Sequence, residues 1–202
     1  MQYLKDSVRS AIISEAMAEF LEKGYQNASM RSIAQGAKTS TGNLYKYFQG
    51  KENLYDAIVG DVYRDLMETI HQFDVRECKE VDEALFPGLL ERVLQTFETN
   101  RTAVSLLLNR SRGSKYEHCK TNFIQVVTQV VTQVMELKLK QQKKRLKNNL
   151  FIHVISCTLA EGISLILKDC RDDHHARELV QKLVDTLYDH LQEKLEYEPL
   201  HP

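Results

Sequence analysis

The residues best suited to chemistry stand in one short segment near the N-terminus. The segment opens with four small or polar residues, Ser40, Thr41, Gly42 and Asn43. Behind them come four side chains that can donate hydrogen bonds to phosphate oxygens, Tyr45, Lys46, Tyr47 and Lys51. At the start of a helix, short residues allow close approach to base edges, while longer side chains reach the phosphates. The types and spacing therefore predict a surface that binds double-stranded DNA.

Each assignment has a structural alternative, because Tyr45 and Tyr47 could be half-buried braces and Gly42 could serve helix packing alone. The surrounding charge favours the DNA interpretation. Residues 24–51 contain no Asp or Glu, although a segment of this length would carry about four at the chain's average. A surface that faces phosphates requires such a local absence of negative charge. The basic residues of this segment are Arg31, Lys38, Lys46 and Lys51.

Helical periodicity predicts the elements that position these residues. Helices are expected over about residues 7–23, 29–37, 40–47 and 51–73. Gly24 should stop the first helix, because glycine enters the left-handed conformation without steric cost. Ser29 and Ser40 are suitable N-caps for the two short helices. Two short helices joined by a four-residue turn and braced by longer helices form a helix-turn-helix.

The remainder of the chain is also predicted to be helical, because only 3 Pro and 8 Gly interrupt it. Residues 123–135 are rich in valine, which favours strands. The valines nevertheless recur every four residues, and this period belongs to a helix. Further helices are expected over about residues 89–100, 101–109, 115–141, 150–168 and 174–197, with connections at residues 73–82 and 142–149. Lys138 to Lys147 is a basic run that suits a solvated helix end, or else an auxiliary phosphate contact.

The N-terminal segment resembles the TetR family of regulators. The resemblance rests on Ile33-Ala34, Ala37, Ser40, Gly42, Leu44-Tyr45, Tyr47-Phe48, Lys51-Glu52 and Leu54, and on the helix from Ile12 to Gly24 with its aromatic Phe20. It covers about the first 60 residues. Two residues depart from the family pattern, since Lys38 stands where glycine is frequent and Thr39 where valine is frequent.

The resemblance implies an all-α fold of two domains. Residues 1–50 would be a three-helix helix-turn-helix DNA-binding domain, and residues 51–202 a helical ligand-binding and dimerisation domain. It also implies a homodimer on a palindromic operator, released by a small-molecule effector. Seven pocket residues are expected from their position and type: Met67, His71, Phe97, Asn109, Tyr116, Phe123 and Gln129.

The last two predicted helices support the dimer independently. Small residues recur at intervals of four on one helix, and apolar residues recur on the other. Small side chains let helices approach closely, so these helices could form half of an intersubunit four-helix bundle. An intrachain core is the alternative. The predicted interface comprises Ser156, Ala160, Ser164, Val180, Val184, Leu187 and Leu191.

Other classes of protein receive little support from the sequence. An enzyme needs converging acid, base or nucleophile groups, and no such motif is recognisable. The four cysteines are widely spaced and form no CxxC pair, so neither a metal nor a cofactor is expected. No signal peptide or membrane span is predicted, which favours a cytoplasmic protein. The remaining alternative is an architectural DNA-binding protein or coactivator of the same fold without an effector.

Overall fold

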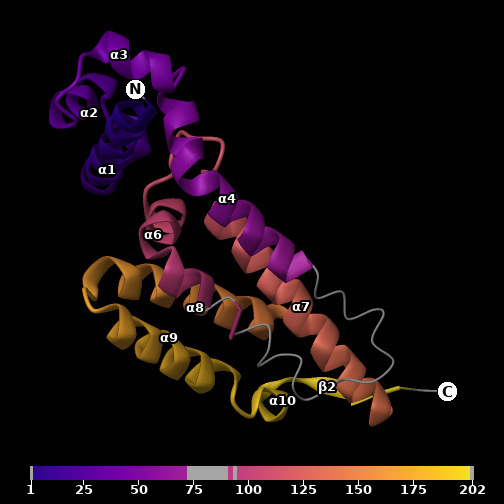
Figure 1. Cartoon of the computed structure of the whole chain (residues 1–202). Coiled ribbons are helices and arrows are strands. Elements are labelled where there is room, and N and C mark those ends of the chain that lie inside the picture. Colours follow the sequence, from indigo (N-terminus) through magenta and orange to yellow (C-terminus); the bar gives the residue numbers. More distant parts are fainter. Residues whose placement is uncertain (1, 72–90, 93–94, 201–202) are drawn as a thin grey trace. The chain divides into compact units, whose positions relative to one another are not determined.

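The computed structural model describes residues 2–71, 91–92 and 95–200 (Figure 1). The chain forms two compact units. The N-terminal unit comprises residues 1–65 and 102–119, and the C-terminal unit comprises residues 66–101 and 120–202. The compact N-terminal unit thus includes more of the chain than the DNA-binding domain predicted at residues 1–50. The predicted connection at residues 73–82 lies outside the described residues.

Four helices of the N-terminal unit follow the order that the sequence predicts. They are α1 (Gln2–Asn27), α2 (Met30–Gly36), α3 (Thr41–Tyr47) and α4 (Lys51–His71), whose last residues belong to the C-terminal unit. Gly24 breaks the regular course of α1 at φ 74°. Ser29 and Ser40 accept hydrogen bonds from the backbone amides of Ser32 and Asn43. The predicted stop and both predicted N-caps are confirmed.

Aromatic residues join residues 102–119 to the N-terminal helices. The Tyr55 ring on α4 contacts the rings of Phe20 and Tyr25 edge-on, at centroid distances of 4.9 and 5.0 Å. Its hydroxyl donates to the carbonyl of Leu106 (3.1 Å) in α6 (Arg101–Asn109). The amide of Tyr25 donates to the carbonyl of Arg110 at 2.8 Å. A buried aromatic cluster with satisfied polar groups therefore unites segments far apart in sequence.

A carboxylate in the same unit joins α1 to α2. Glu19 is buried at 9% exposure and accepts hydrogen bonds from the ammonium of Lys23 (2.8 Å) and the amide of Ser29 (3.1 Å). Burial by itself raises the pKa of Glu19, but these two hydrogen bonds outweigh burial and leave the pKa below its ordinary value. Glu19 thus satisfies the backbone amide of the residue that caps α2.

This arrangement predicts a pH-dependent stability. A carboxylate with a lowered folded-state pKa stabilises the fold above its unfolded-state value of 4.5, and the contribution is lost as pH falls through the folded-state pKa. We expect the wild type to lose more unfolding free energy than Glu19→Gln between about pH 5 and pH 3. Urea unfolding at a series of pH values measures this difference. Equal losses in the two proteins would contradict the role of Glu19.

The C-terminal unit is built from antiparallel helices and one small sheet. It contains most of α7 (Cys119–Gln141), with α8 (Leu150–Asp169), α9 (Asp173–Tyr188) and α10 (Leu191–Lys194). The valine-rich α7 is helical, as its period predicts. Asp172 caps α9 by accepting a hydrogen bond from the amide of His175 at 2.7 Å. Helices α8 and α9 pack side by side (Figure 1).

Two predictions for this unit are wrong. The last helix does not continue to residue 197, because α9 ends at Tyr188 and His190 adopts a positive φ of 50°. The connection at residues 142–149 contains strand β1 (Lys144–Leu146), which pairs antiparallel with β2 (Tyr197–Pro199). Arg145 lies opposite Glu198 and donates to it at 2.6 Å. This pairing joins segments about fifty residues apart, so local periodicity could not predict it.

Helix α8 is apolar on two faces. By length and composition alone it could cross a membrane, and it is the one such helix in the part of the chain that the structure describes. Its inner face forms the core of the unit, where Gly162 leaves room for Leu183 of α9. The buried residues of this face are Ile152, Ile155, Ser156, Leu159, Ala160, Ile163, Ser164 and Leu167. Its outer face exposes four large apolar side chains: Leu150, Phe151, Val154 and Leu165.

Candidate nucleic-acid interface

The turn between α2 and α3 holds the two helices in a fixed relation. Ile33 and Ala34 of α2 and Leu44 of α3 are buried against the unit's core. Lys38 occupies the turn at φ 52°, in the left-handed region that favours glycine. The amide of Thr39 donates to the carbonyl of Ala34 at 2.9 Å and closes the turn. The departure from glycine at residue 38 therefore leaves the backbone conformation of the motif intact.

The N-terminal end of α3 presents a polar surface formed by short side chains. Gly42 is exposed, and among the described residues no atom apart from its neighbours lies within 4 Å of the place where a Cβ would stand. The Asn43 side chain is oriented by a hydrogen bond from its Nδ2 to Thr39 Oγ1 (2.8 Å). Ser40 is exposed and Thr41 is half-buried. A partner can therefore approach this helix end closely and meet a positioned amide.

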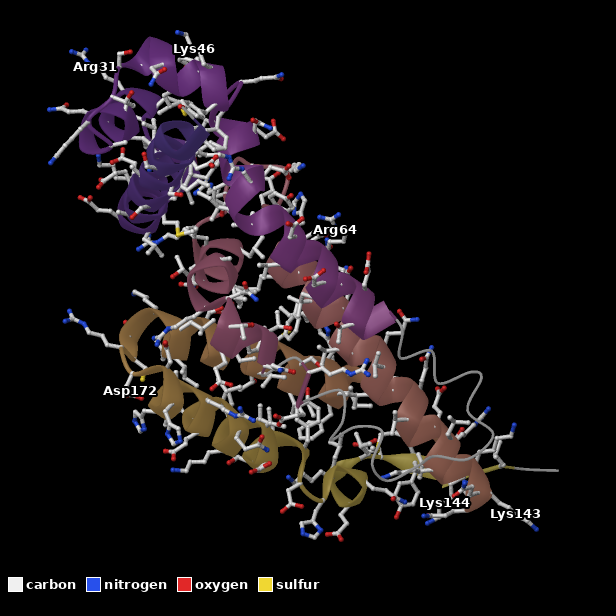
Figure 2. The ribbon with its side chains drawn as sticks, viewed as in Figure 1. Arg31, Lys46, Arg64, Lys143, Lys144 and Asp172 are labelled. Carbon is white, nitrogen blue, oxygen red and sulfur yellow. The ribbon has the colours of Figure 1, made fainter. Side chains whose placement is uncertain are left out.

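Cations surround this helix end. Arg31 on α2, Lys38 in the turn and Lys46 on α3 are all exposed. Figure 2 shows the side chains of Arg31 and Lys46 projecting outward from their helices. The Tyr45 side chain is 49% exposed, whereas Tyr47 is half-buried. The N-terminal end of α3 can thus be approached closely, and it is flanked by exposed cations in a segment without carboxylates. Such a surface is suited to the major groove of DNA and the phosphates beside it.

Comparison with known proteins agrees with this geometry. Residues 12–58 match the sequence model of a family described as "Bacterial regulatory proteins, tetR family". The N-terminal segment is similar to that of TetR-family regulators. This segment includes α2, α3 and the start of α4, so the family match and the exposed helix end coincide. The match and the helical fold together indicate a DNA-binding transcriptional regulator.

Relatives and solved structures extend the likeness. The HTH-type transcriptional regulator UidR of Escherichia coli K12 is 24% identical over 88% of this chain and 89% of its own length. The probable HTH-type transcriptional regulator YttP of Bacillus subtilis is 31% identical over 33% of this chain, a match that spans about a third of YttP. A TetR-family regulator from Bordetella parapertussis has the same fold, with a TM-score of 0.66, 20% identity and coverage of 90% of this chain and 94% of its own.

Lys51 is placed differently from its predicted role. Its ammonium donates to the carbonyls of Gln26 (3.1 Å) and Ala28 (3.2 Å). It also lies 4.7 Å from the centre of the Tyr25 ring. These contacts join the start of α4 to the last turn of α1 and to the segment that follows it. The structure therefore assigns the ammonium to intrachain contacts, while Lys46 projects from α3.

This difference separates two lysines that the sequence treats alike. We expect Lys46→Met to reduce the slope of log affinity against log salt concentration by about one unit, because one phosphate contact is lost. Lys51→Met should instead cost about 1 kcal/mol of unfolding free energy, because its hydrogen bonds to two carbonyls are lost. Salt-dependent DNA titrations and urea unfolding of both variants measure the two effects. A smaller salt slope for Lys51→Met, together with a lower stability for Lys46→Met, would refute the roles given to the two lysines.

The predicted pocket residues are divided between the two units. Asn109 and Tyr116 belong to the N-terminal unit, whereas Met67, Phe97, Phe123 and Gln129 belong to the C-terminal unit. Phe97 borders a cavity of about 20 Å³, which is sufficient for one water molecule. Gln129 is exposed, and Phe123 is a buried core residue at 2% exposure. The side chain of His71 lies outside the described residues.

The structure places most of the predicted interface residues in the core of a single chain. Six of them have at most 3% exposure: Ser156, Ala160, Ser164, Val180, Val184 and Leu191. Leu187 is half-buried and packs against the same core. Such residues have almost no surface left to offer a second copy. Periodicity could not distinguish the inner face of α8 from its outer face, since both carry large apolar side chains.

Proposed function

We propose that this regulator is a cytoplasmic repressor that binds a palindromic operator as a homodimer and is released by a small-molecule ligand. The observation that carries the proposal is the exposed N-terminal end of α3, with its open glycine and surrounding cations. A single helix end reads only a few base pairs, so two copies related by a two-fold axis would provide useful specificity. Occupation of the operator would then exclude other proteins from that DNA.

The proposed DNA contacts fall into two groups. Ser40, Thr41, Gly42 and Asn43 would lie against base edges, where Asn43 offers an amide that can pair with adenine. Tyr45 and Lys46 would contact phosphates. We add Arg31 and Lys38, whose exposure beside α3 gives them the same reach. Tyr47 and Lys51 contribute mainly to the placement of α3 and α4, because one is half-buried and the other is bound to carbonyls.

The proposed dimer surface is the outer face of α8. Phe151, Val154 and Leu165 are 43%, 49% and 58% exposed, respectively. A group of exposed apolar side chains on one helix face often marks a surface that contacts another protein. Packing against α9 covers the inner face of α8. A second copy of the same chain would cover the outer face in an isologous contact, in which both copies use the same surface.

The ligand proposal rests on the resemblance together with the continuity of α4, which begins beside α3 and ends in the C-terminal unit. A ligand that favours one position of α4 over another would alter the separation of the two α3 helices. The predicted pocket residues remain candidates for this ligand.

A metabolite library tests the ligand. The full chain is first screened for compounds that raise its melting temperature, and each compound is then added to the complex with DNA. A compound that both stabilises the protein and lowers its DNA affinity supports the proposal. If stabilising compounds leave the DNA affinity unchanged, the effector-less architectural interpretation holds.

A further inference from the structure

In the C-terminal unit, a histidine side chain contacts a cysteine with one ring nitrogen and a threonine with the other. Cys157 and His153 are one turn apart on α8, and the thiol Sγ lies 3.7 Å from Nε2 of the imidazole. The other ring nitrogen, Nδ1, lies 3.4 Å from Thr128 Oγ1 on α7. Thr128 is buried at 8% exposure, whereas Cys157 is half-buried and His153 is exposed. The contacts therefore lead from a buried hydroxyl to a thiol at the surface.

The hydroxyl of Thr128 determines which imidazole nitrogen carries the proton. A hydroxyl has a single hydrogen, and Thr128 donates it to the carbonyl of Ile124 at 2.7 Å. While this hydrogen bond is made, the hydroxyl oxygen can only accept from His153, and the contact favours the tautomer that carries its proton on Nδ1. In the neutral ring, Nε2 then holds a lone pair that is directed at the thiol of Cys157. This places a base beside a nucleophile, with a third group that orients the base.

We propose that Cys157, His153 and Thr128 form a reactive-thiol site that takes apolar α,β-unsaturated carbonyl compounds. The thiol proton passes to Nε2 of His153, and Sγ bonds to the β-carbon of the electrophile. The electron pair of the carbon–carbon double bond moves to the carbonyl oxygen, which gives an enolate. The proton held on Nε2 then passes to the α-carbon, and the product is a thioether. The addition needs no oxidant or reductant.

The surroundings of the thiol define the class of electrophile. Val154 lies one turn before Cys157 on α8 and is 49% exposed, and Leu150 precedes it at 65%. In a single copy these apolar side chains offer a surface on which an apolar compound can rest beside the sulfur, and the second copy proposed above would compete with the compound for this surface. Cys157 itself lies on the side of α8 that faces α7, because its partner His153 contacts Thr128 there. The site therefore borders the outer face of α8.

Two other cysteines provide internal comparisons in the same chain. Cys170 is also half-buried, but its thiol donates to the carbonyl of Asp172 at 3.3 Å, and a carbonyl does not take up the proton. Cys119 is buried, and burial raises the pKa of its thiol to about 12. Cys170 therefore reports the rate of a half-buried thiol that is hydrogen-bonded to a carbonyl. Labelling of Cys119 indicates that the protein has unfolded.

The test is the rate at which each cysteine of the full chain adds N-ethylmaleimide, followed by peptide mass spectrometry with the reagent in excess. We expect Cys157 to react about tenfold faster than Cys170, because only Cys157 has a base within reach. His153→Gln should reduce the Cys157 rate to that of Cys170. Thr128→Val should reduce it in part, whereas Thr128→Ser should restore it, because the hydroxyl is retained. His174→Ala is the control for loss of an exposed histidine elsewhere.

Rates are compared only where Cys119 remains unlabelled, and this condition excludes unfolded variants. Equal wild-type rates for Cys157 and Cys170 would overturn the proposal. A Cys157 rate in His153→Gln that matches the wild type would overturn it as well. Since the assay requires neither DNA nor a dimer, it is independent of the proposed regulatory function.

Discussion

Replacing Gly42 with glutamate is expected to lower the affinity for operator DNA by about 100-fold or more, with the fold unchanged. Space is available for the side chain, since among the described residues nothing but Gly42's own neighbours lies within 4 Å of the Cβ position. An acidic residue in the first turn of a helix is also favourable for the helix itself. On DNA, however, the same side chain would occupy the space next to the bases and repel the phosphates. Thermal unfolding measures whether the fold is unchanged, and a fluorescence titration with operator DNA measures the loss of affinity.

Two controls distinguish position from charge. Gly42→Gln keeps the bulk without the charge, so it should retain part of the loss. Gly50→Glu introduces the same charge where a Cβ is equally unobstructed within the described structure, but it lies beyond the C-terminal end of α3. Its effect should be at least about tenfold smaller, because charge interactions weaken with distance and screening. Equal losses at residues 42 and 50 would show that α3 does not present its N-terminal end to DNA.

The second large effect separates the two faces of α8. Ala160 has 0% exposure, so Ala160→Glu places an unpaired charge in the core of a single chain. We expect a loss of roughly 4 kcal/mol or more of unfolding free energy. Val154 is 49% exposed, and Val154→Glu should leave the chain folded but monomeric. The monomer should bind operator DNA much more weakly, because each half-site is then bound alone.

Sedimentation equilibrium and urea unfolding of both variants test this distinction. Thr186→Glu is the matched control, because it adds the same charge at an exposed polar position of α9, away from the outer face of α8. A dimeric Val154→Glu would place the interface elsewhere. If Ala160→Glu were stable and monomeric, the result would support the dimer interface predicted from the sequence.

The parts of the fold with local determinants could be predicted from the sequence. Gly24 and the capping serines act through their own backbone and the next turn, so their neighbours in sequence are sufficient to define the short helices. The valines of α7 show the same principle, because their period of four outweighs the preference of valine for strands. The DNA-binding segment was predictable for this reason, since it consists almost entirely of local elements.

The parts that depend on distant contacts could not be predicted. Arg145 and Glu198 pair across two strands that are separated by about fifty residues of sequence. Lys51 was assigned to phosphate because its type and position suit that role, but the carbonyls that bind it belong to a different helix connection. The chain of contacts from Thr128 to Cys157 likewise spans two helices. In each case the missing information was a tertiary neighbour.

The most direct test of the central claim is selection of binding sites by the full chain from a library of random duplex DNA. The proposed function predicts an enriched inverted repeat, with half-site centres separated by one helical turn of about 10 base pairs or a multiple of it. Gly42→Glu should fail to enrich the same repeat under identical salt conditions. Absence of any enriched sequence with the wild type, at a salt concentration where it remains folded, would contradict the account.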